Sequence, residues 1–208
     1  MRRLAQAIFG NPDAVRLKAI TTAERIPFVQ AGRVDVVVDA VTITCARRKL
    51  VDFSTVYYDA GQKVLVPSNS PARSVADLAG KPVCATTGST SLDTLETLPA
   101  PRPVPYPVAQ RTDCLVALQQ GLVDAVTSDD SILVGFKAQD PYTKMIGPSF
   151  APEPYGMAIN QAHPEFVRFV NGVLDGMRAD GTWRAMYARW FGRFIPSIPA
   201  PPAPSYDG

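Results

Sequence analysis

Gln30-Ala31-Gly32-Arg33-Val34-Asp35-Val36-Val37 and Gln119-Gln120-Gly121-Leu122-Val123-Asp124-Ala125-Val126 repeat one pattern at an offset of 89 residues (119 − 30). In each copy a glycine stands where a helix ends with φ > 0, and an apolar strand follows. Such a junction is common in α/β chains and can reflect local chemistry alone. The second interpretation is a chain of two similar lobes, each of which presents the loop after its strand to a shared cleft.

Helix and strand patterns alternate on both sides of these two segments, which predicts α/β architecture with largely parallel sheets. The expected strands cover residues 15–20, 35–42, 62–66, 81–86, 104–106, 124–127 and 144–146. The expected helices cover residues 22–32, 45–50, 92–98, 113–121 and 131–138.

Composition narrows the function classes. The chain has 208 residues, 46% of them apolar, which fits one large domain or two small lobes. The net charge of +2 comes from interspersed acids and bases, so no basic stripe indicates nucleic-acid binding. Residues 34–43 form the longest apolar run, which is interrupted twice by aspartate and is shorter than the ~20 residues of a membrane span.

The sequence at the two ends of the chain supports separate predictions. Residues 4–9 are too short for a signal-peptide core and resemble the end of a helix stopped at Gly10, so we expect the natural chain to extend upstream. Trp183, Met186, Tyr187, Trp190 and Phe191 have helical spacing, and we expect this face to pack in the core; a ligand platform is the alternative. Residues 196–208 predict an extended, unpacked proline-rich tail.

The first loop whose side chains could bind a ligand is Thr42-Ile43-Thr44-Cys45-Ala46-Arg47-Arg48-Lys49. Here a strand ends in hydroxyl groups, and three cations follow. Arg47 lies three residues after Thr44 and can fold back over the strand end, where its planar fork suits a carboxylate. Arg48 and Lys49 are expected to be solvated.

Two further loops complement the first. Ala85-Thr86-Thr87-Gly88-Ser89-Thr90-Ser91 leads from a strand into a helix, whose free N–H groups attract anions; capping alone also explains such residues. Gly88 would let a ligand approach the backbone. In Thr127-Ser128-Asp129-Asp130, Asp130 is expected to cap the next helix, which leaves Asp129 to hold an ammonium group. The three loops together complement a zwitterionic α-amino acid.

A family resemblance joins these loops. The spacing of Thr42, Arg47, Val51-Asp52-Phe53-Ser54, Tyr57-Tyr58 and Gly61-Gln62 resembles the signature of family 3 extracellular solute-binding proteins. The resemblance covers residues 3–195, and the two loops at 87–91 and 127–130 most resemble actinobacterial glutamate-binding importer subunits. It continues in the same order through Asp77-Leu78-Ala79-Gly80-Lys81, Thr87-Gly88-Ser89, Val123-Asp124-Ala125-Val126, Glu153-Pro154-Tyr155-Gly156 and Gly181-Thr182-Trp183.

The resemblance implies a two-lobed, periplasmic-binding-protein-like type II fold, in which each lobe is a mostly parallel sheet flanked by helices. Residues 1–65 and 155–195 would form the first lobe, 66–154 the second, and 196–208 the tail. The first strand of the family, with its aromatic loop, would lie upstream of Met1, so the first lobe would lack that strand. Cys45-Ala46 departs from the family, which usually has acidic residues there.

The resemblance also implies the site. Arg47 would grip the ligand α-carboxylate, with Thr42 and the backbone of Gly88 and Ser89. Asp129 would hold the α-amino group, with the Ala40 carbonyl and Thr42.

The implied function is capture of a polar L-amino acid in an interlobe cleft, with glutamate favoured, then glutamine, aspartate or asparagine. Hinges near 62–68 and 152–158 would close over the ligand, and a monomer would deliver it to the permease of an ABC importer. The protein would work outside the cytoplasm without a cofactor, and any lipid anchor would lie upstream.

The chain has three cysteines, Cys45, Cys84 and Cys114. Cys84 lies in an expected strand and Cys114 opens a helix of the same lobe, so a disulfide between them is plausible and fits an exported protein; three free thiols are the alternative. No C-x-x-C or histidine pair supports a metal site. His163 stands just before a helix with proline in its first turn, which favours a surface capping role.

Two other functions stay open. A cyclohexadienyl dehydratase type of enzyme on the same fold would need a general acid, for which Glu153 is the candidate, although its Pro-Tyr context suits a hinge better. A ligand-sensing receptor domain would bind in the same way but would need additional domains.

Overall fold

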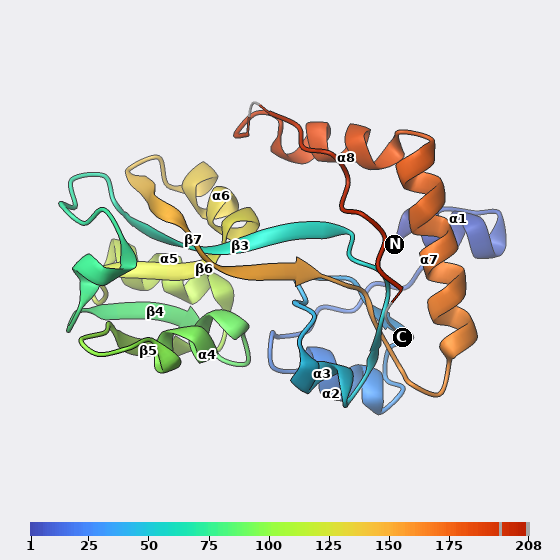
Figure 1. Ribbon diagram of the computed structural model, residues 1–208, viewed down its shortest axis with the longest axis horizontal. Coiled ribbons are helices and arrows are strands. Elements are labelled where there is room, and N and C mark those ends of the chain that lie inside the picture. Colours follow the sequence, from blue (N-terminus) through green and yellow to red (C-terminus); the bar gives the residue numbers. More distant parts are fainter. Residues whose placement is uncertain (196, 207–208) are drawn as a thin grey trace. The chain divides into compact units, whose positions relative to one another are not determined.

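A computed structural model describes residues 1–195 and 197–206, and within it contacts group the chain into two units (Figure 1). Unit 1 holds Met1–Ile20, Arg25–Asp59 and the described residues from Pro154 onward. Unit 2 holds Thr21–Glu24 and Ala60–Glu153. None of the described helices is long and apolar enough to cross a membrane.

The first boundary between the units falls at residues 59 and 60, six residues before the expected position at 65 and 66. The cause is strand pairing: Gln62 through Leu65 are already hydrogen-bonded to Asp129 through Val126 of unit 2. Thr21–Glu24 joins unit 2 because Ala23 packs against Gly88. The second boundary falls after Glu153 instead of after residue 154.

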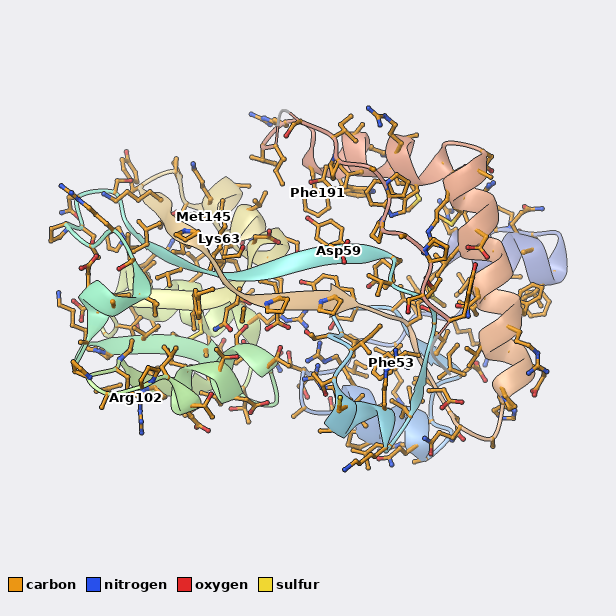
Figure 2. All side chains as sticks on the ribbon, in the orientation of Figure 1. Phe53, Asp59, Lys63, Arg102, Met145 and Phe191 are labelled. Atoms are coloured by element: carbon orange, nitrogen blue, oxygen red, sulfur yellow. A yellow bond between two sulfur atoms is a disulfide. The ribbon has the colours of Figure 1, made fainter. Side chains whose placement is uncertain are left out.

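A five-stranded sheet forms the centre of unit 2, with the strand order β5-β4-β6-β3-β7 (Figure 1). Strand β4 is parallel to β5 and β6, whereas β3 is antiparallel to β6, so the sheet is mixed. Figure 2 shows Lys63 of β3 and Met145 of β7 on neighbouring strands. The strands are β3 (Tyr58–Pro67), β4 (Pro82–Thr86), β5 (Val104–Val108), β6 (Ala125–Asp129) and β7 (Thr143–Tyr155).

The helices of unit 2 start and stop where local signals place them. Ser89 caps α4 by accepting a hydrogen bond from the Leu92 N–H, and Gly121 follows α5 with φ = 70°. The Cys84 and Cys114 side chains form a disulfide that joins β4 to α5 inside the core. The helices are η1 (Val75–Leu78), α4 (Thr90–Thr97), α5 (Arg111–Gln119) and α6 (Asp130–Gln139).

Unit 1 contains a smaller sheet, in which β8 (Ala158–Ile159) lies between β1 (Val36–Val37) and β2 (Asp52–Phe53). Both pairings are antiparallel, so the expectation of a mostly parallel sheet is wrong for the described strands of this unit. Figure 2 labels Phe53 on β2. The helices are α1 (Arg2–Phe9), α2 (Arg25–Gln30), α3 (Cys45–Arg48), α7 (Pro164–Ala179) and α8 (Thr182–Phe191).

Three expected elements near the N-terminus are shorter or absent. Residues 15–20 form no strand: Leu17 is exposed, so the alternation does not follow burial. Helix α2 begins only at Arg25, because Thr21 donates its N–H and its hydroxyl to the Glu24 carboxylate in a preceding turn. Of the expected strand at 35–42, only β1 pairs as a strand, and Thr42 adds an isolated bridge to Tyr155.

The C-terminal helix has two different faces. Trp183 and Tyr187 are buried in the core, and the Trp183 indole donates to the Tyr57 carbonyl at 2.6 Å. Trp190 is 65% exposed and Met186 is also exposed, so the expectation that they face the core is wrong. Trp183 and Tyr187 are four residues apart and therefore lie on the same face of α8, which is the buried face. Trp190 is three residues after Tyr187 and lies to one side of that face.

The described part of the tail packs against other residues of unit 1, contrary to the expected unpacked segment. Arg178 donates to the Pro202 carbonyl at 3.0 Å, and the Ser205 N–H donates to the Thr55 hydroxyl at 2.9 Å. The Tyr206 hydroxyl donates to the Asp175 carboxylate at 2.6 Å. Backbone and side-chain hydrogen bonds therefore hold a segment whose composition alone predicts only an extended conformation.

Candidate functional site

Arg47 folds back over the end of the first loop in unit 1. Its Nη1 donates to the Thr42 carbonyl at 2.9 Å, and its backbone N–H donates to the Thr44 hydroxyl, which caps α3. Thr42 is buried and forms an isolated β-bridge with Tyr155. The guanidinium is thus held beside the Thr42 carbonyl at the end of this segment.

Ala40 lies close to a second cation that the sequence interpretation missed. The Arg25 guanidinium donates to the Ala40 carbonyl and lies 3.8 Å from the Asp39 carboxylate. Arg25 is 2% exposed. A buried guanidinium is stable only beside acceptors and negative charge, which this pairing supplies. Ala40 and Thr42 therefore lie in unit 1 beside two positive charges, those of Arg25 and Arg47.

The loop at Gly88 and Ser89 leads from β4 into α4 in unit 2. Gly88 has φ = 77°, and a Cβ atom there would lie 2.9 Å from the Ala23 Cα atom. Ser89 is engaged within the turn: its N–H donates to the Thr86 carbonyl at 3.1 Å, and its hydroxyl donates to the same oxygen at 2.6 Å. The loop is therefore tightly specified, and glycine is required by both conformation and space.

Asp129 lies at the end of β6 and is 4% exposed. The Ser91 hydroxyl, from the first turn of α4, donates to the Asp129 carboxylate at 3.3 Å. The loop at Ser89–Ser91 and the acid at Asp129 are therefore brought together within unit 2, as two neighbouring strands of one sheet require. Gln62 also belongs to this hydrogen-bond network, since its side chain donates to the Ser91 carbonyl. The sequence interpretation did not predict this role. The signal that could have indicated it is a polar residue in an otherwise apolar strand.

Asp130 is not the cap that the sequence predicts, because Asp129 occupies the N-cap position and Asp130 is the first residue of α6. Burial raises the pKa of the Asp130 carboxyl above its ordinary value of 3.8, and hydrogen bonds from the Ser131 and Gly61 N–H groups oppose this effect. Asp130 Oδ1 has no hydrogen-bond partner among the described residues. Burial of the charged Asp130 carboxylate is therefore energetically unfavourable at the first residue of α6.

Glu153 is buried and accepts a hydrogen bond from the Thr90 hydroxyl at 2.7 Å. It thus contacts the same first turn of α4 from β7.

His163 occupies the N-cap position of α7 but makes no side-chain capping bond; its exposed ring lies 3.4 Å from the Glu165 carboxylate. Cys45 is an exposed free thiol. Within residues 1–195 and 197–206, no cluster of three or more metal-ligating side chains occurs.

Comparison with known proteins places these features in a family. The family model described as bacterial extracellular solute-binding proteins, family 3, matches residues 2–193. The chain therefore belongs to the family 3 extracellular solute-binding proteins, and the relatives described next are binding proteins, not enzymes.

Two relatives illustrate the match. The ABC transporter glutamine-binding protein GlnH of Bacillus subtilis (strain 168) is 34% identical over 190 residues, which are 91% of this chain and 69% of that protein. The glutamine-binding protein of Geobacillus stearothermophilus is 37% identical over 155 residues, which are 74% of this chain and 59% of that protein. The chain thus spans about six to seven tenths of these relatives.

Solved structures agree on the fold. An ancestral arginine-binding protein bound to glutamine superposes with a TM-score of 0.82 at 35% identity, covering 91% of this chain and 86% of that one. The same kind of protein bound to arginine gives a TM-score of 0.84 at 32% identity, covering 92% and 85%. The type II binding-protein fold of this chain is confirmed.

Proposed function

We propose that this chain binds a polar L-amino acid outside the cytoplasmic membrane and delivers it to the permease of an ABC importer. Arg47 of unit 1 takes the α-carboxylate, with Thr42 and the backbone of Gly88 and Ser89 in support. Asp129 of unit 2 takes the α-ammonium group, with the Ala40 carbonyl and Thr42.

The observation that carries this proposal is the chemistry of the two loop ends. A fixed guanidinium stands on the Thr42 carbonyl, and a buried carboxylate is held by the Ser91 hydroxyl. These groups match the two charges of a zwitterion, because guanidinium binds carboxylate through paired hydrogen bonds and carboxylate binds ammonium. Family membership supports the same assignment.

The choice of ligand side chain draws on the relatives. The sequence interpretation favours glutamate, whereas the two relatives described above are glutamine-binding proteins and a third is an L-glutamate/L-aspartate-binding protein of Pseudomonas aeruginosa. We therefore place glutamine beside glutamate as the leading ligands, ahead of aspartate and asparagine.

Calorimetric titration of the purified chain tests the proposal. The panel contains L-glutamine, L-glutamate, L-aspartate, L-asparagine and L-arginine. The matched controls are D-glutamine, L-glutamine with an amidated α-carboxyl group, and the analogue of glutamine that lacks its α-amino group. We expect one L-amino acid to bind, with affinity about 100-fold weaker for the amidated and the des-amino analogues, because a lost charged contact costs ~2–5 kcal/mol. D-glutamine keeps both charges, and we expect it to bind more weakly because its side chain cannot occupy the same position while both charged contacts are made. Equal binding of the controls, or no binding by a folded chain, would contradict the proposal.

A further inference from the structure

Gln62 is a polar side chain inside the buried part of strand β3, with 0% of its surface exposed. It lies directly opposite Asp129 in the antiparallel ladder between β3 and β6. Because directly opposite residues of an antiparallel pair project from the same face of the sheet, the Gln62 and Asp129 side chains are neighbours. Gln62 is followed by Lys63, which Figure 2 labels.

The hydrogen bonds of Gln62 determine the orientation of its amide. Nε2 donates to the Ser91 carbonyl at 3.0 Å and to the Thr127 hydroxyl oxygen at 2.9 Å. The Thr127 hydroxyl in turn donates its proton to the Lys63 carbonyl at 2.9 Å. Both groups that face the amide are therefore acceptors, so the nitrogen, and not the oxygen, must point toward them.

Ser91 connects this amide to the proposed ammonium-binding carboxylate. Its carbonyl accepts from Gln62, and its hydroxyl donates to Asp129 at 3.3 Å. Gln62 therefore ties three parts of unit 2 together: strand β3, the first turn of α4 and the end of β6. The last two carry Ser89 and Asp129.

The Gln62 carbonyl oxygen makes this arrangement costly for folding. Gln62 Oε1 is buried and has no hydrogen-bond partner among the described residues. An unpartnered buried acceptor is destabilising. The next two residues on the same face of β3 are Val64 and Val66, which are buried and apolar. Stability alone would favour an apolar side chain at position 62 as well.

Each partner of the Gln62 amide has another hydrogen bond besides the one to Gln62. The Ser91 carbonyl is also part of the hydrogen-bond ladder of α4, and the Thr127 hydroxyl keeps its bond to Lys63. What the amide adds is a fixed position for Ser91 relative to Asp129.

We propose that Gln62 is a positioning residue for ligand binding, which holds Ser91 and, through it, Asp129 in the geometry that receives the ligand ammonium group. This inference rests on the proposed function. Gln62 acts through Ser91 and Asp129 and, being fully buried, does not itself contact the ligand.

The test compares Gln62→Met with Val66→Ala by calorimetric titration with the best L-amino acid and by thermal denaturation without ligand. Gln62→Met keeps the size of the side chain and removes the amide, so we expect the affinity to fall about tenfold while the melting temperature stays the same or rises. Val66→Ala lies on the same face of the same strand, and we expect a lower melting temperature with unchanged affinity. A residue with a merely structural role would not separate the two readouts in this way.

Wild-type affinity in folded Gln62→Met would overturn the inference, and so would an affinity loss in Val66→Ala equal to that in Gln62→Met. If Gln62→Met does not fold, Ser91→Ala replaces it, because this variant removes only the hydroxyl that reaches Asp129. We then expect affinity to fall several-fold at an unchanged melting temperature, and wild-type affinity would overturn the inference. Failure of the wild-type chain to bind any amino acid would instead reject the proposed function.

Discussion

Gly88 combines a backbone conformation and a close approach that together require glycine. Its φ of 77° is strained for any other residue, and a Cβ atom would lie 2.9 Å from the Ala23 backbone. We expect Gly88→Ala to destabilise unit 2 by about 1–2 kcal/mol from the backbone and by about 1–3 kcal/mol more from the contact. Chemical denaturation measures the sum.

The matched control for this variant is Gly80→Ala. Gly80 has a similar φ of 74°, but nothing lies within 4 Å of its added Cβ atom. It should therefore lose only the backbone part, about 1–2 kcal/mol. Equal losses in the two variants would show that the contact between Gly88 and Ala23 has no energetic weight.

Asp130 predicts a pH dependence of stability. Burial raises the pKa of its carboxyl above the ordinary value of 3.8. The folded chain therefore holds this proton more tightly than the unfolded chain, so stability falls as pH rises from 3.8 through the raised pKa. Asp130→Asn should be more stable than wild type at neutral pH and should lack this fall. Melting temperatures measured from about pH 4 to about pH 7 test the prediction.

Asp77 provides a control of opposite sign. Hydrogen bonds from the Arg73 N–H and from Ser74 lower the pKa of its carboxyl. The stability that Asp77 contributes is present above its ordinary value and is lost as pH falls, so Asp77→Asn should destabilise at neutral pH. If Asp130→Asn behaves like Asp77→Asn, desolvation of Asp130 is not the dominant effect.

Single residues were predictable from sequence where their chemistry is local. The Arg47 N–H donates to the Thr44 hydroxyl three residues back, and the Arg47 guanidinium donates to the Thr42 carbonyl five residues back, so the fold-back of Arg47 is a local contact that spacing can predict. Gln62 and Thr127 are 65 residues apart, and Gln62 and Ser91 are 29 residues apart. Nothing in the local sequence of Gln62 indicates these partners, because sheet register and the seating of α4 determine them.

At the scale of elements, the disulfide between Cys84 and Cys114 fastens α5 to β4. It closes a loop with a sequence separation of 30 residues. We expect the double variant Cys84→Ala/Cys114→Ala to lose about 3–4 kcal/mol of stability, because the crosslink restricts the unfolded chain. Urea denaturation with and without reductant measures this loss.

Thiol counting gives an independent check of the same pairing. One thiol, Cys45, should react in the denatured, unreduced protein, and three should react after reduction. Cys45→Ser should remove the single reactive thiol without affecting stability. Three reactive thiols before reduction would contradict the disulfide.

Element ends marked by glycine or caps were predictable, whereas pairings were not. Gly32 and Gly121 both have positive φ after a helix, as the repeated pattern predicts. The strand expected at 15–20 fails, and the sheet of unit 1 is antiparallel, because pairing depends on which distant segment lies alongside. Similarly, composition cannot reveal that the described tail is held by Arg178 and Thr55.

At the scale of the whole molecule, each of the two units is made of segments that are separate in the sequence. Each unit also contains one set of candidate ligand-binding groups. Unit 1 contributes Ala40, Thr42 and Arg47, and unit 2 contributes Gly88, Ser89 and Asp129. The alternation of helix and strand patterns predicted the α/β class, and the family resemblance predicted the type II fold. The proposed function requires both units to act on one ligand, through Arg47 and Asp129.

Titration of four proteins with the best L-amino acid tests this claim most directly: wild type, Arg47→Ala, Asp129→Asn and the control Arg48→Ala. Arg48 is the neighbouring cation and is not part of the proposed site. Arg47→Ala and Asp129→Asn should each weaken binding about 100-fold, since each removes one charged partner of the ligand, and Arg48→Ala should change it less than about threefold. Wild-type affinity in folded Arg47→Ala or Asp129→Asn would contradict the account.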